Sequence, residues 1–123
     1  GGCACPFGGP SDEDRIAKLL DDWRAAVMAK DINGLMALYA DSYQSAQHSG
    51  KEAVRVYLQR MFEHGQLDDA EVDLALAKIE MRDGTAIASG VALRAEFGAA
   101  GMVLGLVKDG RVWRIDSMHA VPY

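Results

Sequence analysis

The residues best suited to chemistry stand close together near the end of the chain, where Asp116, Ser117 and His119 fall within four positions. These are the residue types of a nucleophile, its base and an orienting acid. The surrounding alternation predicts a strand, which places Ser117 and His119 on one face and Asp116 on the other. Two residues along a strand also span about 6.6 Å. A catalytic triad is therefore not predicted.

The three histidines show no spacing typical of metal ligands, so no metal or other cofactor is expected. His64 ends a predicted helix and is expected to be structural, and His48 lies in a loop, where solvent exposure is the simplest role. His119 shares its predicted face with Trp113 and Ile115, which should point inward. It could be a strand-end residue, a hydrogen-bonding residue of a pocket, or a catalytic base. Without a carboxylate on its face, we expect binding rather than proton transfer.

The two cysteines, Cys3 and Cys5, lie in a stretch rich in glycine and proline. They are too close together for a good disulfide, and no further thiol completes a zinc site. Residues 1–10 are predicted to form a flexible leader, and residues 11–123 a single domain. Gly2-Cys3 resembles the end of a bacterial lipoprotein signal. The location is therefore open between the cytoplasm and export with Cys3 lipidated.

The composition narrows the class of protein. The chain has 123 residues, half of them hydrophobic, which suits one globular domain. No window approaches 18 uninterrupted apolar residues, so no membrane-spanning segment is predicted. The formal net charge is −5 and there is no long basic run, which argues against nucleic acid as a partner.

The first half of the chain has helical periodicity. Ser11 is the expected N-cap of a first helix, and Asp31 that of a second, short one. Ser49 and Glu52 predict a capping box for a third helix, which Gly65 should end. The apolar stripe of the first helix consists of Ile16, Leu19, Leu20, Trp23 and Val27. That of the third helix consists of Val54, Tyr57, Leu58, Met61 and Phe62.

The second half changes to the alternation of strands. Residues 71–76 alternate, and a shift of phase before Ile79 predicts a β-bulge. Asp83-Gly84 predicts a two-residue hairpin turn. The remaining elements are a return strand through Ile87, Val91, Leu93 and Phe97 with a bend at Gly90, a turn at 98–101, a strand at 102–108, a turn at Asp109-Gly110 and a strand at 111–120. Three helices before a four-stranded antiparallel meander predict an α+β fold.

Three segments together resemble a known family. They are residues 23–31 (WRAAVMAKD), 38–41 (LYAD) and 108–115 (KDGRVWRI). Their order and spacing are similar to those of nuclear transport factor 2-like and SnoaL-like domains, over about residues 12 to 120. The resemblance implies a cone-shaped, bent antiparallel sheet wrapped around three N-terminal helices, the cystatin-like or ketosteroid-isomerase-like fold. It also implies a cavity at the open end, and homodimers through the outer sheet face.

The ketosteroid isomerases of this family use a tyrosine, a general-base aspartate and a protonated aspartic acid. Laid on that pattern, the resemblance puts Trp23 at the tyrosine, Gln47 near the base and Met102-Val103 at the acid. An indole cannot exchange a proton at neutral pH, and neither carboxylate is present. An isomerase of that mechanism is not expected.

The sequence favours a small-molecule-binding domain for an apolar, largely neutral ligand. The alternatives are a hydrolase, dehydratase or cyclase that uses His119, and a dimerisation or protein-interaction module. Val112 and Met118 should lie on the outer sheet face and favour a homodimer. The expected pocket residues are Trp23, Tyr43, Gln47, Tyr57, Met61, Ser117 and His119.

Overall fold

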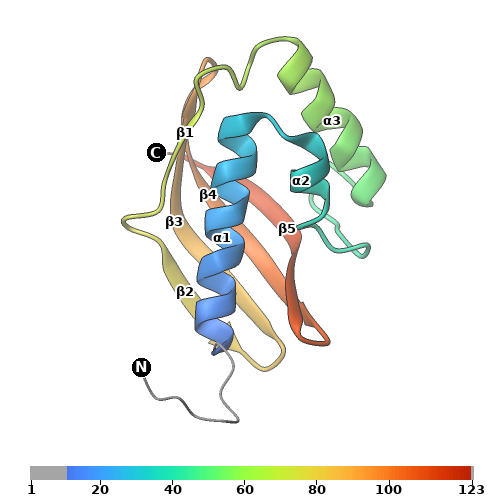
Figure 1. Ribbon diagram of the computed structural model, residues 1–123, viewed down its shortest axis with the longest axis vertical. Coiled ribbons are helices and arrows are strands. Elements are labelled where there is room, and N and C mark those ends of the chain that lie inside the picture. The colour runs from blue at the N-terminus through green and yellow to red at the C-terminus, as the bar shows by residue number, and fades with distance from the viewer. Residues whose placement is uncertain (1–10, 123) are drawn as a thin grey trace.

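Helices cover one face of a curved antiparallel sheet in the computed structural model, which describes residues 11–122 (Figure 1). The strand order is β1-β3-β4-β5, and β2 pairs with β3 as well. The predicted α+β fold is confirmed, whereas the leader with Cys3 lies outside the described residues. The elements are α1 (Asp12–Ala29), α2 (Ile32–Met36), α3 (Lys51–Glu63), β1 (Glu71–Asp73), β2 (Lys78–Arg82), β3 (Thr85–Ala95), β4 (Gly98–Asp109) and β5 (Val112–Val121). None of the helices within 11–122 has the length and apolar character needed to cross a bilayer.

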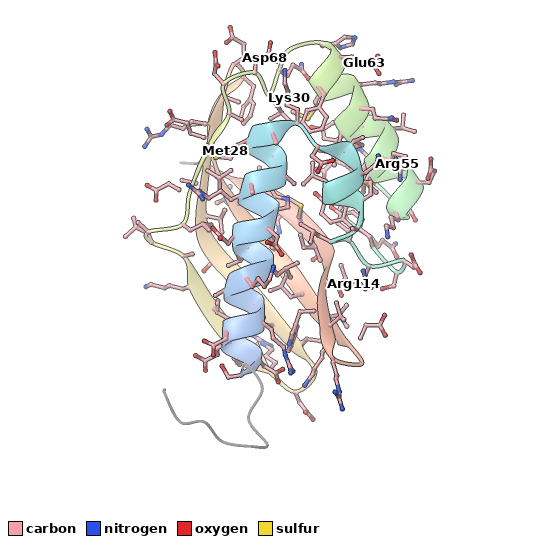
Figure 2. The ribbon with its side chains drawn as sticks, in the orientation of Figure 1. Met28, Lys30, Arg55, Glu63, Asp68 and Arg114 are labelled. Atoms are coloured by element: carbon pink, nitrogen blue, oxygen red, sulfur yellow. The ribbon has the colours of Figure 1, made fainter. Side chains whose placement is uncertain are left out.

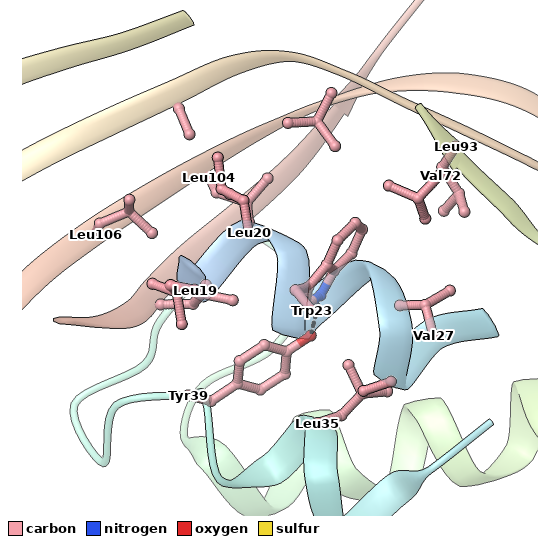
Figure 3. Packing of buried hydrophobic residues seen from close by; sticks show 14 of the residues in the cluster. Leu19, Leu20, Trp23, Val27, Leu35, Tyr39, Val72, Leu93, Leu104 and Leu106 are labelled. Carbon is pink, nitrogen blue, oxygen red and sulfur yellow. Dashed lines mark hydrogen bonds between the residues drawn. The ribbon is translucent and has the colours of Figure 1, made fainter. Parts of the chain in front are cut away.

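The long helix α1 lies across the sheet and supplies the centre of the core. Its predicted cap is confirmed: the Ser11 hydroxyl accepts a hydrogen bond from the Asp14 amide at 3.1 Å, and the Asp14 carboxylate accepts one from the Ser11 amide. Its predicted apolar stripe is also buried, packing toward Leu104 and Leu106 of β4 (Figure 3). Asp31 caps α2 as predicted, accepting from the Gly34 amide at 3.0 Å.

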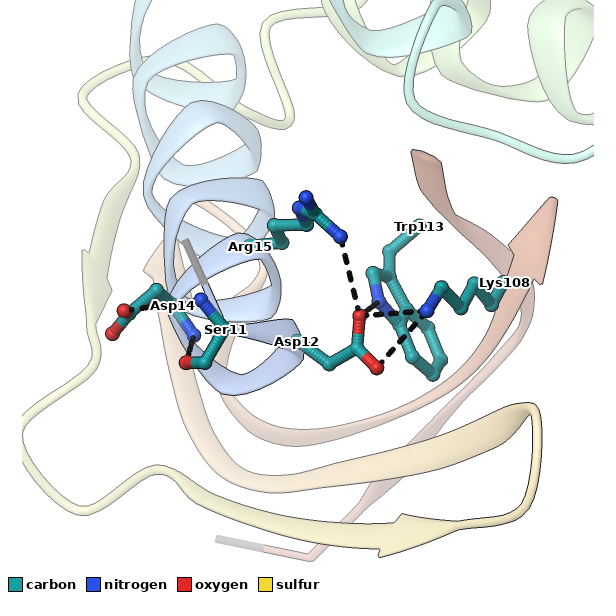
Figure 4. Close-up of polar contacts among 6 residues, drawn as sticks. All are labelled: Ser11, Asp12, Asp14, Arg15, Lys108 and Trp113. Atoms are coloured by element: carbon teal, nitrogen blue, oxygen red, sulfur yellow. Dashed lines mark hydrogen bonds and ion pairs between the residues drawn. The ribbon is translucent and has the colours of Figure 1, made fainter. Parts of the chain in front are cut away.

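The start of α1 is tied to the β4–β5 hairpin by Asp12 (Figure 4). Its carboxylate accepts a hydrogen bond from the Trp113 indole at 3.1 Å and pairs with Lys108 at 3.0 Å and Arg15 at 3.5 Å. The hydrogen bond from Trp113, followed by the contact with Lys108, lowers the pKa of Asp12. One carboxylate thus joins two segments that are distant in the sequence.

The capping box predicted at the start of α3 is wrong. Gly50 is the N-cap, with φ at +92° and no side-chain hydrogen bond, a conformation that suits glycine. Ser49 instead pairs with Gln44 in an isolated bridge, and the Glu52 carboxylate lies 3.7 Å from Arg55. The helix nonetheless ends near Gly65, as predicted.

The strand predicted over 71–76 is also wrong in its second half. β1 ends at Asp73, whose carboxylate accepts a hydrogen bond from the Ala75 amide at 2.8 Å and turns the chain. Leu76 is left 76% exposed. Because β1 and β2 both pair with β3, the interruption is a wider break than a one-residue bulge. It faces the bend at Gly90, which is confirmed.

The three turns that join the long strands agree only in part with the sequence predictions. Asp83-Gly84 links β2 to β3 as predicted. The turn predicted at 98–101 is wrong, since Ala95 pairs with Gly98 and leaves 96–97 as the turn. The last turn is shifted by one residue, to 110–111, because Asp109 still pairs with Val112.

An irregularity in β5 reverses the faces of its last residues. Leu106 pairs with Ile115 and Gly105 with Ser117, so Asp116 is an extra residue in β5. A Cβ built on Gly105 would meet the Ser117 hydroxyl, which places both on the outer face. The prediction that Ser117 and His119 share the inward face of Trp113 and Ile115 is therefore wrong. Inward positions after the bulge are Met118 and Ala120.

Candidate functional site

A chamber of about 350 Å³, here the deep chamber, lies between α1, α3 and the inner face of the sheet. It exists because α3 packs mainly on α2 rather than on the sheet, with Val54 as its one buried residue. Three other apolar residues of α3, Tyr57, Leu58 and Met61, are therefore left to line a space. The lining residues are Trp23, Val27, Tyr39, Tyr57, Leu58, Met61, Gln66, Leu67, Leu93, Phe97, Ala100, Met102, Met118 and Ala120.

The polar atoms of the deep chamber largely satisfy one another. The Trp23 indole donates a hydrogen bond to the Tyr39 hydroxyl at 3.3 Å, which in turn lies 3.4 Å from the sulfur of Met118. The Tyr39 ring also stacks on Tyr43, with centroids 5.5 Å apart. Burial raises the pKa of Tyr39, so its hydroxyl stays neutral. The wall consequently offers hydrocarbon and few free polar groups.

An adjoining space of about 290 Å³, here the outer chamber, has a more polar wall. It shares Tyr39, Tyr57, Leu58, Met102, Met118 and Ala120 with the deep chamber and adds Tyr43, Ser45, Gln47, His48, Val54 and His119. Its polar side is the loop before α3. Backbone hydrogen bonds hold this loop on β5 and on itself, from the Gln44 amide to the Asp116 carbonyl at 2.9 Å and from Gly50 to Tyr43 at 2.8 Å.

The segment between α3 and β1 borders the deep chamber through Gln66 and Leu67. Lys30, which ends α1, forms an ion pair with Asp68 of this segment (Figure 2). The two charges lie at the same end of the molecule as Glu63, away from Arg114. The pair links the segment to the end of α1 on the exposed side of the chamber wall.

Six of the seven predicted pocket residues border one of the two chambers. Trp23, Tyr57 and Met61 line the deep chamber. The outer chamber is lined by Tyr43, Gln47, Tyr57 and His119. Ser117 lines neither, because the bulge at Asp116 turns it to the outer face.

Two residues of the wall occupy positions that differ from those expected from the sequence. His48 is expected to be a solvated loop residue, yet its ring lies against Tyr57 with centroids 4.4 Å apart. Met118 is expected on the outer face, yet it borders both chambers. The position of His48 directly before an amphipathic helix could have indicated its contact with that helix. Nothing in the local alternation of β5 signals the position of Met118.

The imidazoles that border the chambers are those of His48 and His119, both at the outer chamber. His119 is exposed at the edge of the sheet, and no carboxylate is paired with it or with His48 in the described part of the chain. Burial raises the pKa of Asp116, but its carboxylate is directed toward Gly105 on the outer face and lines neither chamber. No group of three histidine, cysteine or acidic residues within 11–122 could hold a metal ion.

Comparison with known proteins places the fold. No family model matches the sequence, and no curated protein matches it significantly. Among solved structures, an NTF2-like protein of unknown function from Pseudomonas putida has a TM-score of 0.73 at 23% identity, over 94% of this chain and 91% of its own. An uncharacterised protein with a cystatin-like fold from Caulobacter vibrioides has a TM-score of 0.75 at 14% identity, over 89% of each chain.

A third similar structure is Bd1075 of Bdellovibrio bacteriovorus, with a TM-score of 0.75 and 12% identity. It covers 88% of this chain, which spans only 39% of that protein's length. Likeness at these identities defines the architecture and leaves the activity open. The predicted resemblance is thereby confirmed as a shared fold: this chain has the cystatin-like fold of the NTF2-like proteins.

Proposed function

We propose that this domain binds a small apolar molecule in the deep chamber. The observation that carries the proposal is the chamber itself, about 350 Å³ lined without a single Lys, Arg, Asp, Glu or His. Ligand sites commonly have volumes of roughly 300–1,000 Å³ with mostly hydrophobic walls. A pocket of this size with this wall is suited to a hydrocarbon ligand.

Binding is better supported than catalysis. A hydrolase, dehydratase or cyclase needs a titratable group within reach of the reacting atoms. The predicted candidate, His119, borders the outer chamber, as does His48, and both lie outside the lining of the deep chamber, where the apolar ligand is proposed to bind. The walls of the deep chamber instead provide shape and apolar contact, which are the requirements of a binding site.

The methionines of the chain allow a direct test with cyclohexane as the probe. Met61, Met102 and Met118 line the deep chamber, whereas Met28 and Met81 are exposed elsewhere. In NMR spectra of methyl-labelled methionine, we expect cyclohexane to shift the signals of the first three and to leave the other two unchanged. Equal shifts for all five, or none, would refute a ligand site in the chamber.

A matched pair of substitutions on β4 separates binding from folding. Ala100 lines the deep chamber and Ala99, its neighbour, is exposed on the opposite face. Ala100→Phe should fill the chamber and abolish the cyclohexane shifts, whereas Ala99→Phe should retain them. Circular dichroism checks that both variants are folded. Retained binding in Ala100→Phe would place the ligand elsewhere.

The outer face of the sheet supports a second role, assembly of two copies. A shallow apolar groove there includes Leu76, Gly101 and Val121, and Leu76 is the most exposed large apolar residue of those described. Val103 lies nearby on the same face. Met118, predicted to be part of this surface, points inward instead. The proposed homodimer through the outer face therefore depends on Leu76, Val103 and Val121, and its test is given below.

A further inference from the structure

We infer that the ligand is an elongated, uncharged amphiphile, with its apolar end in the deep chamber and a hydrogen-bonding head against Gln47 and His48 in the outer chamber. This inference rests on the proposed function and adds the chemical class and the orientation of the ligand. The two chambers share six wall residues, so one molecule can extend through both. Tyr57 lies at their junction and borders each of them.

The deep chamber suits the apolar end because its polar atoms are already engaged. Trp23 donates to Tyr39, and Tyr39 contacts Met118, so a polar head placed there would find few free partners. A buried polar group without a partner is unfavourable. Gln66, the one amide of this wall, is exposed at its border.

The outer chamber suits the head because two of its side chains keep their hydrogen-bonding capacity. The main chain of His48 is held by Ser45: the His48 amide donates to the Ser45 hydroxyl at 3.1 Å, and its carbonyl accepts from the Ser45 amide at 2.8 Å. The imidazole packs against Tyr57. Neither that ring nor the amide of Gln47 has a hydrogen bond to another described residue. Both groups can donate and accept.

The charge of the residues that line the chambers determines which polar head group the ligand can have. No Lys, Arg, Asp or Glu lines either chamber. A carboxylate head would find no fixed cation, and an ammonium head no carboxylate, so each would lose hydration without an ionic partner. A hydroxyl or carbonyl group loses less hydration free energy on burial than an ion does. It can also form hydrogen bonds with the Gln47 amide and the His48 imidazole. An alcohol or ketone of medium chain length is therefore the favoured class.

The test compares 1-decanol, decanoate and decylamine, three probes with the same chain and different heads, by isothermal titration calorimetry near neutral pH. We expect decanol to bind at least about tenfold more tightly than either ion. In the double variant Gln47→Ala/His48→Ala, the loss of two neutral hydrogen bonds should weaken decanol binding about tenfold. Cyclohexane, which has no head, should bind that variant as it binds the unmodified protein.

A control variant and the other outcomes complete the design. His64→Ala removes an exposed histidine that lines neither chamber and should change nothing. If cyclohexane binds but the ions bind as well as decanol, the ligand class assigned here is wrong and the proposed function stands. The same holds if the double variant weakens cyclohexane and decanol equally. If none of the four probes binds, the proposed function fails, and this inference with it.

Discussion

The indole of Trp23 and the hydroxyl of Tyr39 meet at 3.3 Å in the interior, where α1 faces the segment between α2 and α3 (Figure 3). Both side chains are almost fully buried, and both border the deep chamber. The contact satisfies the only hydrogen-bond donor of the indole. It therefore joins the stability of the core to the shape of the binding site.

Replacing Trp23 should strongly destabilise the protein. Truncation of a buried aromatic residue typically costs about 3–5 kcal/mol, a large part of the roughly 6–18 kcal/mol expected for this chain length. We expect Trp23→Ala to lower the free energy of unfolding, measured in urea titrations, by about 3–5 kcal/mol. Tyr57→Ala, at a half-exposed side chain of the same chamber, should have a much smaller effect. A melting temperature changed by only a degree or two in Trp23→Ala would contradict its central position.

Alkaline pH should destabilise the fold through Tyr39. Burial raises the pKa of this phenol above that of the unfolded chain, so above about pH 10 the unfolded state ionises first. The stability is complete below that pH and decreases as the pH rises further. In Tyr39→Phe, the decrease between about pH 9 and 11 should be smaller, with the remainder coming from Tyr43, whose pKa burial also raises. The control variant Tyr57→Phe should lose stability with rising pH as the unmodified protein does. If Tyr39→Phe also loses stability as steeply as the unmodified protein, Tyr39 is not the group responsible.

Acid should remove the contribution of Asp12. The hydrogen bond from Trp113 and the contact with Lys108 hold its pKa below the usual 3.8, so its contribution is present above that value and lost as the pH falls through the lower one. Asp12→Asn should melt below the unmodified protein at about pH 6, and the difference should shrink toward about pH 2. Asp22→Asn, in an exposed pair with Lys18, should have little effect at any pH. A difference independent of pH would show that the charge of Asp12 is not the cause.

The parts of the fold that can be predicted from the sequence depend on neighbouring residues. Ser11 and Asp31 cap their helices through atoms three residues away, and the stripe containing Trp23 follows from helical periodicity alone. Asp83-Gly84 forms its hairpin from two adjacent residues. These signals depend little on the tertiary context, so the order of most elements and the buried stripe of α1 can be predicted from the sequence.

The wrong predictions arise where the conformation of one element depends on residues of another. The bulge at Asp116 has room for the Ser117 hydroxyl because the facing residue on β4 is Gly105, whose missing Cβ would lie within 3 Å of it. The alternation within β5 carries no trace of that glycine, so it assigns Met118 and His119 to the wrong faces. His48 escapes prediction for a similar reason, since its contact with Tyr57 joins a loop to a helix.

Gly90 is a second glycine whose role depends on a residue distant in the sequence, and it allows a test of how the bend in the sheet is stabilised. Gly90 and Gly84 both have φ of +74°, but a Cβ on Gly90 would clash with the Leu76 carbonyl, whereas one on Gly84 meets nothing within 4 Å. Both alanine variants bear the same conformational strain. We expect Gly90→Ala to destabilise the protein clearly more than Gly84→Ala in chemical unfolding. Equal losses of stability in the two variants would mean that residues 74–77 can move away from an added Cβ at position 90 without destabilising the protein.

The last prediction is that the protein forms a homodimer through the outer face of its sheet. Light scattering after size-exclusion chromatography at micromolar concentration should give twice the chain mass of 13.3 kDa. Val103, partly buried on the outer face between His119 and the bend of β3, would lie within the interface, and Val103→Asp should leave a folded monomer because a buried unpaired charge is strongly unfavourable. Val56→Asp, at an exposed valine of α3, should remain dimeric. A monomer mass for the unmodified protein, or a dimer that survives Val103→Asp, would exclude this face as the interface.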